Sequence, residues 1–186
     1  MNLKSHILSV DGSWEEVVDD CRATVGKAEL GHEPSSFFKQ SILMAEHSPI
    51  RDIHIRWKWT DIPSWIATHW SRHKFEKFIK TQRSDRTGID RTKLPQDAPV
   101  TFTGNANTQQ LIDAWRKRLC YQASPQTREY AEDFKIALRD PEPEISDVLV
   151  PNCVYRACCP EMSTCGWWQK FAATLTTEEI IDGKQR

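Results

Sequence analysis

Apolar positions along this chain recur first at helical spacing and then, beyond Pro49, at every second residue. Ser13 and Glu16 form a capping box ahead of a helical apolar pattern, which predicts a helix over about 14–26. A second helix is predicted from Pro34 to just before Pro49, because proline favours a helix start and cannot continue a helix.

Residues 53–59 alternate Ile or Trp with charged and imidazole side chains, which is the pattern of a strand with one apolar face. Further elements are predicted in this order: a helix at 61–73, a short strand at 75–82, a strand at 100–103 within a long loop, and helices at 107–121 and 127–138. Helices around a few strands predict an α+β domain with a small mixed or antiparallel sheet. The length predicts one domain over 1–186.

Composition narrows the class of protein further. With 39% hydrophobic and 27% charged residues, the chain has the balance of a compact globular domain. No apolar run approaches the roughly 20 residues of a membrane-spanning helix. The first ten residues lack the apolar stretch of a secretory signal, so we expect a cytoplasmic protein whose six cysteines are reduced or metal-bound.

The net charge of −1 conceals an uneven distribution of charge. Residues 71–93 hold eight Lys or Arg against three acids, with Phe75 and Phe78 interleaved. Such a stretch suits a phosphate-bearing ligand, and equally a solvated basic face. Residues 140–147 reverse the balance and, with two prolines, predict an exposed acidic turn.

Short motifs in the middle of the chain occur in a distinctive order. The first is His47, Ser48 and Pro49, before the strand. At the end of the next helix come Arg72, His73 and Lys74, and after six intervening residues Thr81, Gln82 and Arg83. A helix from Asn107 then carries Arg118 near its end. In this order and at these distances, the motifs resemble the flavin-dependent thymidylate synthases. The resemblance covers roughly residues 30–140 and not the tail.

The resemblance implies a role for each matching residue. Those implied in catalysis are Arg118, Arg72 and His69; in nucleotide binding, Arg72, Thr81, Gln82, Arg83 and Arg118; and in flavin and folate binding, His47, Ser48, His73, Lys74 and Asn107. Guanidinium groups suit such a site on physical grounds too, because phosphate favours bidentate donors and an enolate-like pyrimidine oxygen favours a nearby cation. Considered alone, His47 is also typical of a helix end, and His69 with His73 share a helix face that can bind a metal.

Several positions depart from the family pattern. Lys74 replaces an Arg, six residues rather than seven precede Thr81, and His69 stands where the family has Gln. Lys does not form the planar fork of Arg, so the nucleotide half of the pattern is kept better than the flavin half. This leaves room for a relative that transfers a one-carbon unit without flavin reduction.

The activity that the resemblance implies is one-carbon transfer from methylenetetrahydrofolate to C5 of dUMP, with FAD passing a hydride from NADPH. A homo-oligomer, dimer or tetramer, with sites shared between subunits is implied as well. A flavin-free dUMP or dCMP hydroxymethylase is the first alternative. The second is a zinc-stabilised nucleic-acid-binding module that uses the basic stretch, although nucleic acid is the less favoured partner.

The tail at 148–168 lacks helical periodicity and concentrates four cysteines. A structural zinc is predicted on Cys120, Cys153, Cys159 and Cys165, with Cys158 to spare. Buried or free thiols are an equal alternative, an iron–sulfur cluster is a weaker one, and a cysteine nucleophile on the pyrimidine ring also stays open.

Overall fold

A computed structural model describes residues 4–175 of the chain. Its elements, in order, are β1 Ser5–Asp11, α1 Trp14–Ala23, α2 Ser36–Ala45, the 3₁₀ helix η1 Ser48–Asp52, β2 His54–Pro63, α3 Ser64–Ser71, β3 Glu76–Ile79, α4 Ser84–Thr87, the 3₁₀ helix η2 Arg91–Lys93, β4 Pro99–Asn107, α5 Thr108–Arg118, α6 Pro125–Leu138, α7 Pro143–Val148, α8 Asn152–Tyr155 and α9 Trp167–Ala172.

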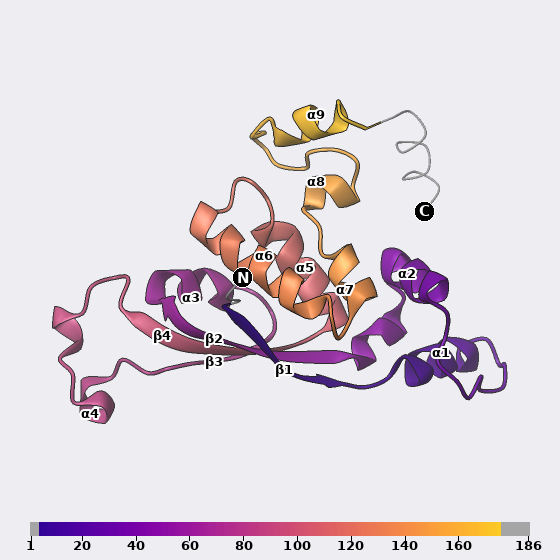
Figure 1. Ribbon diagram of the computed structural model, residues 1–186, viewed down its shortest axis with the longest axis horizontal. Helices are drawn as coiled ribbons and strands as arrows, with labels where there is room; N and C mark the ends of the chain where they lie inside the picture. Colours follow the sequence, from indigo (N-terminus) through magenta and orange to yellow (C-terminus); the bar gives the residue numbers. More distant parts are fainter. Residues whose placement is uncertain (1–3, 176–186) are drawn as a thin grey trace.

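The described strands form one antiparallel sheet in the order β1-β2-β4-β3. Helices α3, α5 and α6 cover one face of this sheet (Figure 1). Alternate residues of β2 and β4 are buried beneath them, and the residues between point to the other face. The predicted α+β class with a small sheet flanked by helices is therefore confirmed, with antiparallel pairing throughout the described strands.

A cluster of aromatic side chains joins the helices to the sheet. Trp57 on β2 packs edge-on against Trp115 of α5, with ring centroids 5.6 Å apart, and Trp70 of α3 lies 4.7 Å from Trp115. Phe134 of α6 lies 4.3 Å from Trp115. All four side chains are fully buried, so this cluster fixes how α3, α5 and α6 sit on the sheet.

Helix starts follow the capping signals. The Ser13–Glu16 capping box is present, and a second box joins Asn107 and Gln110 at the start of α5. The predicted helices and strands exist, with ends that differ by a few residues; β4 is longer than expected, since it begins at Pro99 and runs to Asn107. Between β3 and β4, residues 80–95 form an arm that projects beyond the sheet (Figure 1).

Three features differ from the sequence-based expectation. No strand was expected at Ser5–Asp11, which is an edge strand recognisable only through its pairing with β2. The exposed acidic turn expected at 140–147 is correct only for Asp140 and Pro141, because the rest of the segment forms α7, in which Glu144, Ile145 and Ser146 are buried. The tail also contains α8 and α9, each too short for a helical period to show in the sequence.

Partly buried hydrogen bonds explain why the acidic segment folds inward. The Trp14 indole donates to Glu142 Oε2 at 2.8 Å, and the Ser146 hydroxyl donates to the Lys135 carbonyl at 2.9 Å. These contacts satisfy polar groups that would otherwise favour solvent.

Gly104 provides a test of the packing under α5. A Cβ at this position would lie 2.2 Å from Cζ2 of the buried Trp57 ring, so Gly104→Ala should reduce the free energy of unfolding by about 2 kcal/mol or more. Urea unfolding followed by circular dichroism measures the change. Thr103→Ala, on the neighbouring half-buried position of β4, serves as the control and should cost less than about 1 kcal/mol. Equal midpoints for the two variants would contradict this packing.

Candidate functional site

A cluster of basic side chains forms where the end of α3 meets the end of α5. The Arg118 Nε donates to His73 Nε2 at 2.7 Å, and its Nη2 donates to the main-chain carbonyl of His69. Arg72 lies close enough for its charge to act on both Arg118 and His69. We call His69, Arg72, His73 and Arg118 the α3–α5 cluster.

Burial keeps the imidazole of His73 neutral. Its pKa is lowered from 6.5 to about 4, first by burial and then by the positive charges of Arg118 and Lys77. A neutral imidazole can accept the Arg118 N–H through one ring nitrogen, which assigns the proton to the other. His73 also lies parallel to the Phe75 ring, with centroids 6.3 Å apart.

Arg118 is half-buried and has no carboxylate partner among residues 4–175. Burial lowers its pKa, and the nearby charge of Arg72 lowers it further. Within residues 4–175, neither Arg72 nor Arg118 takes part in an ion pair. A guanidinium has five N–H donors, and two of those on Arg118 are used, so the others remain available to a ligand. Paired cations with unused donors suit an anion, such as a phosphate or an oxyanion.

His69 connects the cluster to the start of α6. Its Nδ1 lies 2.8 Å from the Thr127 hydroxyl, which lies 2.7 Å from the hydroxyl of the capping residue Ser124. Burial lowers the pKa of His69, and the charges of Arg118 and Arg72 lower it further. The amino end of α6 adds partial positive charge to this side of the cluster.

The predicted nucleotide-binding turn lies in the projecting arm. Arg83 makes two hydrogen bonds to the Asp85 carboxylate, at 3.0 and 2.7 Å, and the Thr81 hydroxyl accepts from the Arg83 main-chain N–H. Thr81 and Arg83 are exposed, and Gln82 is half-buried. No hydrogen bond or ion pair among the described residues joins this turn to the α3–α5 cluster.

The predicted flavin-binding residues do not form one cradle within a single chain. Exposed His47 and Ser48 begin η1 beside Glu46, which pairs with Arg116 of α5. Arg116 and Arg118 are two residues apart on a helix, and thus point to different sides of α5. Lys74 is exposed, and the side chain of Asn107 is used to cap α5. These residues therefore do not fit a flavin in one chain, and we assign no chemical step to it.

Glu46 fixes the other side of α5. Burial raises the pKa of its carboxylate, but hydrogen bonds from Arg116, Tyr155 and Gln109 outweigh burial and lower the pKa to about 2. The Arg116 guanidinium also lies 3.5 Å from the centroid of the Tyr155 ring in α8. Arg116 therefore has a structural role and joins α2, α5 and α8.

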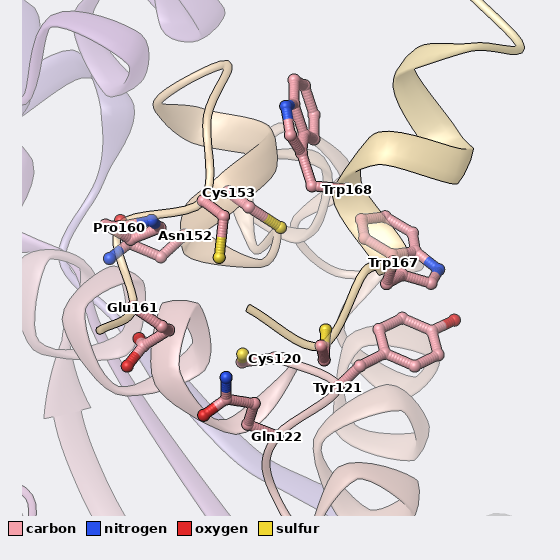
Figure 2. A pocket seen from close by; sticks show the side chains of 11 residues that line it. Cys120, Tyr121, Gln122, Asn152, Cys153, Pro160, Glu161, Trp167 and Trp168 are labelled. Carbon is pink, nitrogen blue, oxygen red and sulfur yellow. The ribbon is translucent and has the colours of Figure 1, made fainter. Parts of the chain in front are cut away.

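The four predicted zinc ligands line one small cavity between α5 and the tail (Figure 2). Burial raises the pKa of Cys153, and the thiols of Cys120 and Cys159 raise it further, so these three lie close enough to interact. Across residues 4–175, however, no group of three or more His, Cys, Asp or Glu side chains is arranged to hold a metal.

Several contacts of the cluster could not be predicted from the sequence. Thr127 holds His69, Phe75 stacks on His73, and Lys77 donates to the His73 carbonyl. Thr127 lies 58 residues beyond His69, so no spacing rule connects them. Phe75 and Lys77 lie within the basic stretch, and nothing in the sequence distinguishes them from its other residues.

Comparisons with known proteins support the fold. No family model matches the chain, and no curated protein matches its sequence significantly. Among solved structures, the chain is similar to the UMP/dUMP methylase PolB from Streptomyces cacaoi, solved bound with 5-Br dUMP. The TM-score is 0.63 and the identity 12%, over 79% of this chain and 94% of PolB. At that identity the likeness establishes a shared fold. No helix within residues 4–175 is long and apolar enough to cross a membrane.

The lowered pKa of His73 predicts how stability depends on pH. Between pH 6.5 and about 4 the unfolded chain binds a proton at this residue that the folded chain does not, so the free energy of unfolding should fall as pH falls through this interval. His73→Gln keeps an acceptor for Arg118 and removes the titration, so its stability should fall less. Urea unfolding at several pH values measures the pH dependence of stability in wild type and in His73→Gln.

His32→Gln, at an exposed position outside the cluster, is the control and should behave as wild type. Equal pH dependence in His73→Gln and wild type would contradict a lowered pKa at His73.

Proposed function

We propose that this protein binds dUMP at the α3–α5 cluster and transfers a one-carbon unit to C5 of the base. The half-buried Arg118, with unused donors and no carboxylate partner among the described residues, is the observation that carries the proposal. It is supported by the fold shared with PolB, whose name describes methylation of UMP and dUMP.

Each residue of the cluster has a distinct part in this proposal. Arg118 lies beside the pyrimidine and stabilises the negative charge that builds on a carbonyl oxygen as C5 becomes nucleophilic. Neutral His73 orients Arg118 without neutralising it. Arg72 is exposed at the edge of the cluster and binds the nucleotide phosphate. The His69 side chain is held by Thr127, and this fixes the main-chain carbonyl of His69, which accepts a hydrogen bond from Arg118.

A second copy of the chain completes the site in this proposal. The turn at 81–83 projects away on the arm (Figure 1). Phe78, in β3 just before the arm, is 66% exposed, and Ile89, on the arm, is 53% exposed. Exposed apolar side chains on and beside a projecting arm favour contact with another subunit. We propose a homo-oligomer in which Thr81, Gln82 and Arg83 of one subunit approach the α3–α5 cluster of another.

The one-carbon donor in this proposal is methylenetetrahydrofolate. The resemblance further implies FAD and NADPH. A flavin would need residues from more than one subunit, because Glu46, the neighbour of His47, pairs with Arg116, on a side of α5 different from that of Arg118. The visible spectrum of the purified protein separates the two enzyme candidates. A flavin band, present at purification or after reconstitution with FAD, supports the methylase, whereas its absence favours the dUMP or dCMP hydroxymethylase, in which water captures the exocyclic methylene.

Arg118→Lys tests the part assigned to Arg118. Lys keeps the charge but loses the fork that holds His73 and the His69 carbonyl, so turnover should fall by about tenfold or more while dUMP affinity falls less. Calorimetric titration gives the affinity, and product formation by mass spectrometry gives the turnover. Lys117→Arg, at an exposed neighbouring position on α5, is the control. Full turnover in folded Arg118→Lys would make Arg118 structural; tight duplex DNA binding that weakens steeply with salt would instead support the nucleic-acid module.

Mixing two variants of lowered activity tests whether the site is shared. Arg83→Ala and Arg118→Ala remove groups on the arm and in the cluster, and each alone should lower activity. If each site takes one group from each subunit, random exchange of the two variants in a dimer should restore about a quarter of the wild-type sites. A mixture no more active than its components would place both residues in a site within one chain.

A further inference from the structure

The cavity at the end of α5 gathers thiols from separate parts of the chain. Cys120 follows α5, Cys153 lies in α8, and Cys159 and Cys165 lie in the irregular segment between α8 and α9. Figure 2 shows the sulfur atoms of Cys120 and Cys153 bordering the same space. All six cysteines are unpaired.

The size and lining of this cavity suit one ion better than a small molecule. The volume of the cavity is about 10 Å³, counted as the space open to the centre of a water-sized sphere. This is close to the minimum that holds a single water molecule. Among the described residues that line the cavity there is no histidine. The one acidic residue there, Glu161, pairs through its carboxylate with Lys117 at 3.0 Å. The remaining donors are mostly sulfur atoms, which favour a soft or borderline cation.

The hydrophobic core holds the start of the tail through Leu149 but does not reach its later part, which therefore needs a link of this kind. Beyond Cys153, no residue up to 175 is buried. The tail is held instead by surface contacts, such as the stacking of Trp167 on Tyr121 with centroids 4.7 Å apart and the Lys117–Glu161 pair. Exposed contacts of these kinds contribute little each.

We propose that Cys120, Cys153, Cys159 and Cys165 bind one structural Zn²⁺ that fastens the tail to the end of α5. Four thiols lose their protons to solvent on binding, and the four thiolates coordinate the ion tetrahedrally. The described residues include no ready-made group of three ligands, so the segment carrying Cys159 and Cys165 must move toward Cys120 and Cys153 as the metal binds. That segment is irregular and exposed, which allows the movement.

The proposed metal lies next to the α3–α5 cluster in sequence. Cys120 is two residues beyond Arg118, so a zinc there fixes the end of the helix that carries this guanidinium. The metal has no part in the chemistry and binds whether or not dUMP is the substrate. Its presence is therefore tested independently of the proposed function.

Metal content of protein purified without an affinity tag, measured by inductively coupled plasma mass spectrometry, tests the proposal. We expect about one zinc per chain. Single Ser variants at Cys120, Cys153, Cys159 and Cys165 should each lower the content several-fold. The matched controls are Cys158→Ser, adjacent in sequence but outside the cavity lining, and Cys21→Ser in α1; both should retain zinc.

A second measurement uses the wild-type chain and does not depend on the folding of any variant. Cobalt exchanged into the protein should give the strong visible absorption of a tetrahedral thiolate site, and four thiols should become reactive only after the metal is removed. The proposal would be overturned by little metal together with freely reactive thiols, or by a disulfide among the four cysteines. It would also be overturned by stoichiometric iron in place of zinc, or by a zinc loss in Cys158→Ser equal to that in the four ligand variants.

Discussion

The guanidinium of Arg118 is held by an imidazole and a main-chain carbonyl rather than by a carboxylate. A carboxylate partner would have compensated the positive charge of the guanidinium, which would then attract an anionic ligand only weakly. Neutral acceptors fix the orientation of the guanidinium and leave its charge uncompensated. The lowered pKa of His73 is part of this arrangement, because a charged imidazole could not accept the Arg118 N–H. The proposed site therefore depends on keeping His73 neutral.

This pairing requires α3 and α5 to meet at a fixed distance, and the buried aromatic side chains supply that constraint. Trp70 precedes His73 by three residues and Trp115 precedes Arg118 by three, and the two indoles pack 4.7 Å apart. The end of α3 with the residues that follow it, and the end of α5, thus each contribute one side chain to the core and one to the cluster. Trp57 and Gly104 in the sheet beneath set the depth at which Trp115 sits. The geometry of the cluster is consequently a property of the whole core.

Local patterns predicted most of the fold, and long-range contacts account for what they missed. Capping at Ser13 and alternation at 53–59 depend on near neighbours, and both were correct. β1 is an edge strand that exists through pairing with β2, and α7 is buried through Trp14 and Lys135, so neither could be read from its own segment. In the site, the resemblance pointed to Arg118, His73 and His69, which the structure brings together. It could not indicate that 81–83 would project on an arm, nor that Thr127 would hold His69.

The central claim is that Arg118 lies beside the reacting carbon of a pyrimidine nucleotide. A crystal of this protein with 5-bromo-dUMP tests it directly, because the bromine marks C5 and its anomalous scattering locates that position independently of the rest of the density. The account predicts a bromine peak next to the α3–α5 cluster, with the phosphate at Arg72 and at the arm of a neighbouring subunit. A bromine peak elsewhere on the protein, or no bound nucleotide in crystals where the cluster is open to solvent, would contradict it.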